Sequence, residues 1–468
     1  MLEKMNQIIV WMVDMVWGLP LIILILAVGA YLTIRLKILQ LHHLPRALKF
    51  MVKNEEGGTG EVTSFAALCT ALSATIGTGN IVGVATAIVA GGPGALFWMW
   101  FAALLGMATK YAEGLLAIKF RKVSENGHVL GGPFYYIELG MGSKFRWLAK
   151  CFAFFGAFAG LMGIGTFTQV NGITTAVGNF ASSSVDSVLT LFGKQYSLPV
   201  IITGLVITVC AGLVLIGGLK RISDFAQIVV PFMAISYVVI CLILLIGNAS
   251  AIPSAIAEIV QGAFGLRAAA GGALGAMLVA MQKGIARGIF SNESGLGSAP
   301  IAAAAAQTKE PVRQGLVSMT GTFIDTIIIC TMTGLSIVVT KSWDIGLEGV
   351  AVTDHAFRTG LPFHPGFASF LLMLCLIFFA FTTIIGWNYY SERCVEYLTN
   401  GNMKTVRVYR WLYILAVFLG PYMTVKAVWN IADIFNGLMA FPNLIALFAL
   451  SGVVVKESQE YFKRVRRM

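Results

Sequence analysis

An apolar segment from about Val62 to Ala90 is long enough to cross a lipid bilayer, yet small and polar residues interrupt its middle. The interruption reads Ser73-Ala74-Thr75-Ile76-Gly77-Thr78-Gly79-Asn80-Ile81-Val82-Gly83. Glycine lets the backbone leave helical angles without a steric penalty. Unpaired backbone groups are costly in hydrocarbon, so a broken helix survives there only where it lines a protein cavity. The segment therefore predicts either a mid-membrane site for a small solute or ion, or a close crossing of two helices on small residues.

The composition of the chain is that of a polytopic membrane protein. Of its 468 residues, 57% are hydrophobic and 12% are charged. A soluble domain carries roughly 25% charged residues and could not bury this much apolar surface. The seven cysteines have no paired spacing that would indicate a disulfide framework or a zinc site. We therefore predict an all-α bundle of transmembrane helices in a lipid bilayer.

The net charge of +11 comes from basic loops between the predicted spans. When the chain is divided into eleven spans, 24 of the 33 Lys and Arg residues fall on one side of the membrane and five on the other. Cytoplasmic loops carry such an excess of basic residues. We therefore predict a multi-pass protein of the cell membrane, with its N-terminus outside and its C-terminus in the cytoplasm. This placement of the charges indicates no nucleic-acid partner, and nothing in the sequence indicates an obligate protein partner.

The predicted chain has four parts, which are an N-terminal region, two halves of five spans each and a basic cytoplasmic tail. Their residue ranges are 1–60, 61–250, 251–455 and 456–468. The N-terminal region holds an interfacial segment at residues 1–16, an extra apolar span from Trp17 to Leu36 and a basic cytoplasmic loop. Because acidic Glu3 and Asp14 precede this span, we interpret it as a retained helix rather than a signal peptide.

A second interrupted apolar segment lies between about Ala268 and Ala306. Its middle reads Phe290-Ser291-Asn292-Glu293-Ser294-Gly295-Leu296-Gly297-Ser298-Ala299-Pro300. With the extra span set aside, the two breaks fall in the first and sixth of ten spans, as is typical of inverted-repeat transporters. Half-helix ends offer N–H groups to a carboxylate and carbonyls to an ammonium group or Na⁺. The chain has no phosphate-binding loop of the Walker type, which favours an ion gradient over ATP as the energy source.

Both interrupted motifs, together with Gly91-Gly92-Pro93-Gly94-Ala95, resemble the signatures of the alanine/glycine:cation symporter family. The resemblance covers essentially the whole chain. It implies eleven transmembrane helices, with one extra N-terminal helix before a 5+5 inverted-repeat core similar to that of the neurotransmitter:sodium symporters. It also implies that the protein is not an enzyme but imports a small neutral amino acid, alanine or glycine, together with a sodium ion.

The resemblance implies a sodium site between the first break and the eighth span of the core. The carbonyls of Ser73 and Ile76 would face the ion, and the carbonyl of Phe379 with the hydroxyls of Thr382 and Thr383 would complete its ligands. The last three residues lie within about one helical turn of each other, and a hard cation prefers oxygen ligands. The alternative for the two threonines is a hydroxyl bonded to the preceding turn of their own helix.

The implied amino-acid site lies at both breaks. Its residues are Thr78, Gly79, Asn80, Gln169, Phe290, Thr383 and Trp387. N–H groups around the first three would hold the carboxylate, and carbonyls near Phe290 would hold the ammonium group. Phe290, Thr383 and Trp387 would shape a small pocket, and Gln169 would add a polar contact. Alternatively, Trp387 belongs to the interfacial belt of aromatic residues, and Gln169 bonds a neighbouring helix.

Several charged residues fall within apolar segments, where an ionised group is expensive and usually functional or paired. We expect a structural or gating contact from Asp325. Lys110 and Glu113 are three residues apart on one helical face, which favours an ion pair or snorkelling. Arg287 and Glu293 flank the second break and could together form a gate.

Other functions stay open at this stage. Within transport, the substrate could be glutamine or another neutral amino acid, and the coupling ion could be a proton. A membrane receptor or a passive channel would belong to a different class. A receptor or a membrane enzyme would bring a soluble domain or a catalytic cluster at the membrane face, and the sequence has neither pattern.

Overall fold

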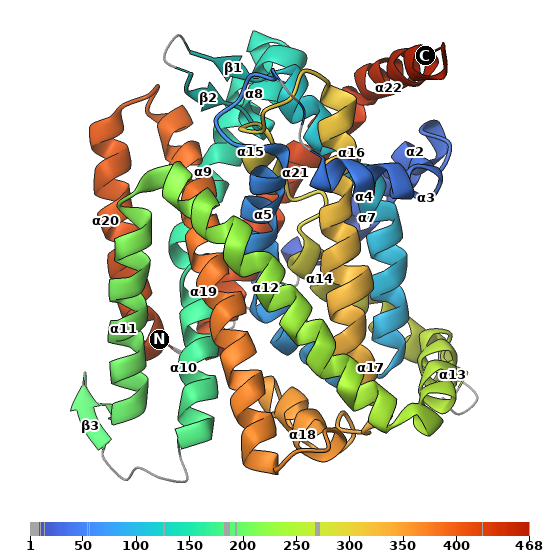
Figure 1. Ribbon diagram of the computed structural model, residues 1–468, viewed down its shortest axis with the longest axis vertical. Coiled ribbons are helices and arrows are strands. Elements are labelled where there is room, and N and C mark those ends of the chain that lie inside the picture. The colour runs from blue at the N-terminus through green and yellow to red at the C-terminus, as the bar shows by residue number, and fades with distance from the viewer. Residues whose placement is uncertain are drawn as a thin grey trace.

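The computed structural model is mostly helical, as the composition predicts (Figure 1). It describes residues 9, 11–13, 15–53, 55, 57–124, 127–181, 188–191, 194–266, 272–423 and 425–467. Most of the predicted interfacial segment 1–16 lies outside these residues. Seven of the described helices are long and apolar enough to cross a membrane, or eight when one bent pair counts as a single span. The chain is therefore an all-α polytopic membrane protein.

The first half of the chain follows the predicted order of spans. Its helices, after α2 (Leu19–Arg35), α3 (Leu39–His42) and α4 (Leu44–Val52), are α5 (Ser64–Thr75), η1 (Gly79–Gly83), α6 (Val84–Gly91), α7 (Gly94–Lys119), α8 (Pro133–Tyr135), η2 (Tyr136–Gly140), η3 (Ser143–Phe145), α9 (Arg146–Met162), α10 (Phe167–Ala181), α11 (Leu198–Leu215) and α12 (Gly218–Gly247). The apolar helix α2 covers most of the predicted extra span. The predicted third span consists of two helices, α9 and α10, because the chain leaves the helix around Gly163.

The second half also follows the predicted order. Its helices are η4 (Ala249–Ala251), α13 (Ile252–Ala263), α14 (Ala273–Asn292), α15 (Ala299–Ala303), α16 (Pro311–Thr322), η5 (Phe323–Cys330), α17 (Thr331–Val339), α18 (Val350–Gly360), α19 (Pro365–Leu398), α20 (Met403–Leu419), η6 (Gly420–Tyr422), α21 (Val425–Ala449) and α22 (Ser451–Arg467). Three predicted spans, α2, α14 and α20, are not among the long apolar helices. Helix α14 carries Lys283 and Arg287, and α2 and α20 have only 17 residues each. The count of eleven spans therefore stays a prediction.

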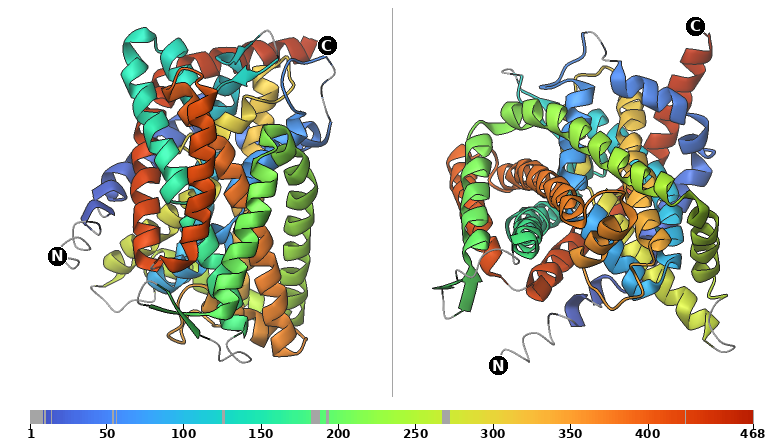
Figure 2. Two further views of the ribbon diagram at one scale, coloured as in Figure 1. Left: turned by 90° about the vertical axis from the view of Figure 1, so that its left-hand side faces the viewer. Right: turned by 60° about the horizontal axis from the view of Figure 1, so that its bottom comes forward.

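The two ends of the bundle differ. Helix α22 and the short hairpin of β1 (Lys122–Val123) and β2 (Val129–Leu130) lie at one end, and α13 and α18 lie at the other (Figure 1). A second hairpin, of β3 (Val188–Leu191) and β4 (Lys194–Ser197), belongs to the end that holds α18. Helix α19 packs along α9 and α10 within the bundle (Figure 2). The basic tail and the hairpin before α8 therefore share one end, as the charge distribution predicts.

The chain before α5 and the chain after α15 are joined at the end that holds α22. Thr59 and Thr308 form an antiparallel bridge, and Val62 and Ala306 form a parallel one. The Arg121 guanidinium donates hydrogen bonds to the carbonyls of Thr59, Ala306 and Thr308 at distances of 2.7, 2.6 and 3.1 Å. The approach to the first broken helix and the exit from the second therefore form one hydrogen-bonded unit.

Candidate functional site

The first break is short and is capped by side chains. Helix α5 ends at Thr75, Ile76 is extended (φ −78°, ψ 96°), and the helical path resumes at η1 with a bend of 52°. The Gly77 N–H donates to Asn80 Oδ1 at 2.9 Å, and the Thr78 N–H donates to Gln169 Oε1 at 3.1 Å. Two amide side chains therefore replace the backbone partners that the broken helix has lost.

Gly77 lies at the tightest contact of this break. A Cβ atom at this position would lie 2.5 Å from Thr383 Oγ1 and 3.0 Å from Gln169 Oε1. The first distance is shorter than real Cβ contacts allow, and the second is at the tight end of those observed. The glycine therefore lets α10 and α19 approach the broken backbone from two sides.

Four of the five predicted sodium ligands lie together beside this break. The Thr383 hydroxyl is 3.2 Å from the carbonyl oxygen of Ile76 and 3.0 Å from that of Phe379. The Thr382 hydroxyl donates to the same Phe379 carbonyl at 2.9 Å. Both threonines thus bond to the preceding turn, as the alternative predicts, but Thr383 also bridges α19 to the first broken helix.

Ser73, the fifth predicted ligand, lies one turn earlier on α5. Its hydroxyl donates to the Thr70 carbonyl at 2.8 Å. Gly386 of α19 lies against this hydroxyl, because a Cβ atom at Gly386 would be 2.6 Å from Ser73 Oγ. α5 and α19 are therefore in close contact along the whole stretch that carries the predicted ligands.

A cavity of about 510 Å³ reaches the first break at Thr78. The Thr78 hydroxyl is buried and has no hydrogen-bond partner among the described residues. The other lining residues come from η1, α6, α10, α14, α21 and α18 with the chain before it, and include Val82, Asn171, Arg287, Glu348 and Trp429. A cavity of this size can admit a small solute.

The second break is longer and carries a charged side chain. Between α14 and α15, Glu293, Gly295 and Gly297 all have positive φ, of 56°, 87° and 83°. Trp387 Nε1 donates to Glu293 Oε1 at 2.8 Å, and the Ser298 hydroxyl donates to Glu293 Oε2 at 2.5 Å. Trp387 is 0% exposed. The interfacial alternative for Trp387 is therefore wrong, since a belt residue would face lipid headgroups.

The two breaks meet each other around Gly79. A Cβ atom at Gly79 would lie 3.3 Å from Ser291 Cα and 3.6 Å from Phe290 Cδ1. Asp325 joins both breaks, because its carboxylate accepts from Asn80 Nδ2 at 2.7 Å and from the Ser291 hydroxyl at 2.9 Å. Asp325 thus makes the structural contact expected of it, and Asn80 turns its amide nitrogen toward this carboxylate.

The predicted gate between Arg287 and Glu293 is wrong. Arg287 instead pairs with Asp433 of α21 through two contacts of 3.1 and 3.2 Å. Its guanidinium lies 5.5 Å from the ring centroid of Phe290 and 5.2 Å from that of Trp429. The Glu293 carboxylate lies against Trp387 and Ser298 instead, because the left-handed backbone of Glu293 ends α14 and redirects its side chain. Sequence reasoning missed Asp433, although an acid within an apolar segment was a usable signal.

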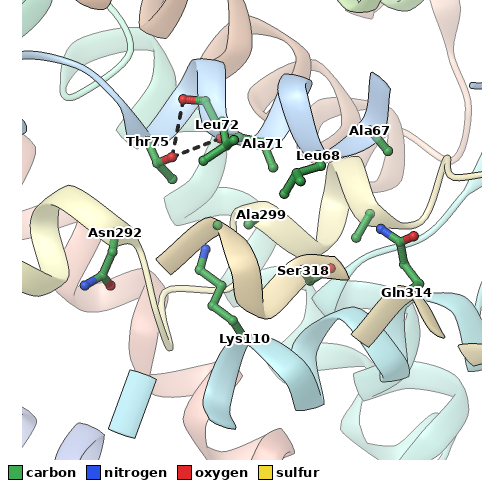
Figure 3. A pocket seen from close by; sticks show the side chains of 12 residues that line it. Ala67, Leu68, Ala71, Leu72, Thr75, Lys110, Asn292, Ala299, Gln314 and Ser318 are labelled. Atoms are coloured by element: carbon green, nitrogen blue, oxygen red, sulfur yellow. Dashed lines mark hydrogen bonds between the residues drawn. The ribbon is translucent and has the colours of Figure 1, made fainter. Parts of the chain in front are cut away.

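The predicted pair of Lys110 and Glu113 is wrong as well, because the structure shows no ion pair between them within 4.0 Å. Glu113 accepts a hydrogen bond from Asn443 Nδ2 at 2.7 Å. The Lys110 ammonium points instead into a cavity of about 20 Å³ that Thr75 and Asn292 also line (Figure 3). Both side chains are buried, so neither snorkels to the surface.

The residues implied for the substrate lie in two places, beside the first break and beside the second. Thr78 and Gln169 contact each other directly, Gly79 lies beside Phe290, and Thr383 contacts the first break. Gln169 bonds a neighbouring helix, as the alternative predicts, because its Oε1 accepts from the Thr78 N–H, and its Nε2 donates to the Ile164 carbonyl at 2.9 Å. Trp387 lies one turn beyond Thr383 on α19 and faces the second break. In this conformation the Thr78 N–H, which the family resemblance implies for a carboxylate, donates to Gln169.

Comparison with known proteins supplies the remaining evidence. The profile of the sodium:alanine symporter family matches residues 2–468. A "Sodium/alanine symporter AgcS" of Methanococcus maripaludis is 45% identical and covers 97% of this chain and 96% of its own length. An "Uncharacterized transporter" of Haemophilus influenzae is 54% identical over 96% of this chain and 95% of its own length. A "Probable sodium/glutamine symporter GlnT" of Bacillus subtilis is 38% identical over 96% of this chain and 89% of its own length.

Proposed function

Because the chain belongs to the sodium:alanine symporter family, whose members are transporters and not enzymes, we propose that it imports alanine or glycine together with Na⁺. The observation that carries this proposal is the contact of the Thr383 hydroxyl with the Ile76 carbonyl. This contact ties the first break to α19 through oxygen atoms, where a co-transported cation would couple the two.

The sodium ion, in this proposal, binds between the first broken helix and α19. Its ligands are the carbonyls of Ser73, Ile76 and Phe379 and the hydroxyls of Thr382 and Thr383. The oxygen atoms of the last four already lie close together, and oxygen is the ligand that a hard cation prefers. The ion would take the place of the hydroxyl hydrogens that now point at the Phe379 and Ile76 carbonyls. Each hydroxyl would then turn a lone pair toward the ion.

The amino acid binds next to this ion, where the two breaks meet. Its carboxylate takes the Thr78 N–H from Gln169, together with N–H groups at Gly79 and Asn80. Carbonyls near Phe290 accept from its ammonium group. The rings of Phe290 and Trp387, with Thr383, close the remaining sides, and the nearby cavity at Thr78 supplies the entry path.

The proposed transport cycle depends on how the broken helices contact α19 and the neighbouring helices α9 and α10. Sodium would hold α5 against α19 and so favour the state that is open to the outside. Binding of the amino acid would then complete the site. A rocking motion of the broken helices and α7 against α9, α10 and α19 would release both solutes to the cytoplasm.

The proposal includes the finer architecture. Eleven spans would comprise the extra helix α2 within residues 1–60 and two inverted repeats at 61–250 and 251–455, and 456–468 would be the cytoplasmic tail. The N-terminus would lie outside the cell membrane. Support comes from α22 and the hairpin of β1 and β2, which lie together at one end of the bundle (Figure 1).

Uptake of labelled alanine into proteoliposomes tests the proposal. We expect concentrative uptake under an inward Na⁺ gradient and none when K⁺ or choline replaces Na⁺. Equal uptake in every cation would remove sodium from the mechanism. Counterflow with glutamine separates the second candidate, which the similarity to GlnT favours. Glutamine that exchanges faster than alanine or glycine would replace them as the substrate. Conductance without substrate saturation would indicate a passive channel.

A further inference from the structure

Three carboxylates are buried in the core without a paired cation. Glu113, Glu293 and Asp325 are each 0% exposed. Among the residues that the structure describes, none of the three forms an ion pair within 4.0 Å. A buried carboxylate without a paired cation must be stabilised by hydrogen bonds, by another bound cation or by a proton.

Lys110 can balance one of these three charges. It is 3% exposed, and its charge acts on all three carboxylates. A sodium ion at the site proposed above would balance a second charge, because the ligands of that site are neutral carbonyls and hydroxyls. One negative charge is then left over in the middle of the membrane.

Asp325 is the carboxylate best stabilised in its ionised form. It accepts three hydrogen bonds, from Asn80 at 2.7 Å, from Thr326 at 2.8 Å and from Ser291 at 2.9 Å. Several donors to one carboxylate favour the charged state. The excess charge is therefore assigned to the two glutamates, because Glu293 accepts from two side chains and Glu113 from one.

Glu113 and Glu293 accept fewer side-chain hydrogen bonds than Asp325 does. Glu113 Oε1 accepts from Asn443, but Glu113 Oε2 has no hydrogen-bond partner among the described residues. Asn443 Nδ2 also donates to the carbonyl of Gly295 at 2.9 Å, which links Glu113 to the loop that carries Glu293. The Tyr136 hydroxyl bonds to Asn443 Oδ1. Asn443 therefore connects Glu113 to the backbone of the loop that carries Glu293, and we call these residues the glutamate network.

A second observation at the same place points to a ligand. The Tyr390 side chain is 1% exposed, and its hydroxyl has no hydrogen-bond partner among the described residues. Both Glu113 and Glu293 are close enough to act electrostatically on this hydroxyl. The Tyr390 ring lies against Trp387, with ring centroids 5.7 Å apart. A buried hydroxyl and a buried carboxylate oxygen are thus both left unpaired beside the two carboxylates.

We propose that Glu113 and Glu293 together bind one proton and exchange it with the cytoplasm during each transport cycle. One carboxylate takes up H⁺ and becomes a neutral carboxylic acid, and no other bond changes. The groups that face the pair are Lys110 of α7, Asp325 of η5, Tyr136 of η2, and Trp387 and Tyr390 of α19.

The exchange depends on the proposed transport function, and the charge count above uses its sodium site. Without that ion two negative charges are left over, so the binding of at least one proton still follows. Glu293 accepts a hydrogen bond from Trp387 of α19, across the surface on which the broken helices would rock. When that contact opens, Glu293 loses a donor and gains access to water. Its affinity for the proton changes at this step, which couples the proton to movement of the amino acid.

Infrared difference spectroscopy on the purified protein tests the binding without requiring transport. We expect wild type to show the C=O stretch of a protonated carboxyl group, and Glu113→Gln and Glu293→Gln to lack it. The matched control is Glu457→Gln, at a partly exposed residue paired with Lys119 on the surface, which should keep the band. If wild type shows no such band at any pH between about 5 and 9, the proposal is overturned.

A pH-sensitive dye inside alanine-transporting proteoliposomes tests the exchange. We expect sodium-driven uptake in wild type to move protons, and Glu113→Gln to reduce proton movement per alanine at least about tenfold. Sodium-driven uptake by wild type without proton movement would overturn the exchange. If wild type takes up no alanine, the proposed substrate fails, and the infrared band still decides whether the pair binds a proton.

Discussion

The two breaks solve the same structural problem in different ways. The first covers only Ile76 to Thr78, is held by the neutral side chains of Asn80 and Gln169, and turns a carbonyl toward α19. The second runs from Glu293 to Ser298, uses three residues of positive φ, and directs a carboxylate toward α19. One break therefore presents backbone oxygen and the other presents charge to the same helix.

This difference assigns different tasks to the breaks. Neutral carbonyls can bind a cation without holding a buried charge when the cation is absent. A buried carboxylate must always be compensated, so its surroundings have to change together with its protonation or contacts. In the proposed mechanism, the first break binds the ion reversibly and the second couples charge to movement.

The largest expected effect concerns the backbone of the second break. A Cβ atom at Gly297, where φ is +83°, would lie 2.7 Å from Phe152 Cε2 and 2.9 Å from Asn443 Cγ. We expect Gly297→Ala to destabilise the protein by about 3 kcal/mol or more, from left-handed strain and overpacking together. Gly92→Ala is the matched control, because φ there is +71° but no atom lies within 4 Å. Thermal denaturation in detergent should show a loss of about 1 kcal/mol for this control. Equal losses would mean that packing at the second break is loose.

Removal of the donor to Glu293 should have the next largest effect. Trp387→Phe keeps a ring but leaves the buried carboxylate without one of its two hydrogen bonds, at a cost of about 2 kcal/mol. We expect a lower maximal uptake rate and a lower apparent Tm. Trp147→Phe, at an indole that is 62% exposed, should change neither. An unchanged rate in Trp387→Phe would remove this contact from the coupling mechanism.

The two threonines of α19 sharpen the comparison at the first break. Thr383 contacts both the Ile76 and Phe379 carbonyls, whereas among the described residues Thr382 bonds only within α19 and to Met233. We expect Thr383→Ala to raise the half-saturating Na⁺ concentration about tenfold, or about 1.4 kcal/mol, and Thr382→Ala to raise it less. Sodium titrations of alanine uptake measure both. A larger effect at Thr382 would indicate that the ion binds farther from the first break than we propose.

The smallest expected effect is a pH dependence at the end of the bundle that holds α22. His128, on the hairpin of β1 and β2, lies between Glu396 and Glu61, with nitrogen–oxygen distances of 3.0 and 3.1 Å. Hydrogen bonds to Glu396 and Glu61 raise the pKa of His128 to about 9. The resulting stability is fully present below the ordinary pKa of about 6.5 and is lost as pH rises through about 9.

Variants of His128 test this dependence. Between about pH 6.5 and pH 9, we expect the free energy of unfolding of wild type to fall by about 1 kcal/mol, because solvent screens part of the interaction. The free energy of unfolding of His128→Gln should fall much less. Thermal denaturation across the pH range measures the difference. An identical pH profile for both proteins would contradict the prediction. The infrared band of the buried glutamates should be unaffected, because His128 lies outside that network.

Much of the fold could be predicted from the sequence because the signals are local. Glycine and small polar residues mark both breaks within apolar segments, and the spacing of Phe379 and Thr383 places their oxygen atoms on one face of a helix. The family resemblance is confirmed by the match over residues 2–468. The ligand roles assigned to individual residues stay predictions.

The partners of the charged residues could not be predicted in the same way. Arg287 and Asp433 are 146 positions apart in the chain, and Trp387 and Glu293 are 94 apart. Such contacts depend on how α14 crosses α19 and α21, which no local pattern encodes. The left-handed backbone at Glu293 decides its direction, and this conformation is unusual for a residue other than glycine. Neighbours in the sequence were therefore poor guides to neighbours in space.

The unit that joins the chain before α5 to the chain after α15 has a kinetic consequence. Since Arg121 and the two bridges hold Thr59 and Thr308 together, neither half-helix can swing at that end without the other. Intermediates in which only one half-helix has moved are then excluded. Opening at that end becomes a single event with one rate constant, and a fluorophore on either half-helix should report the same exponential.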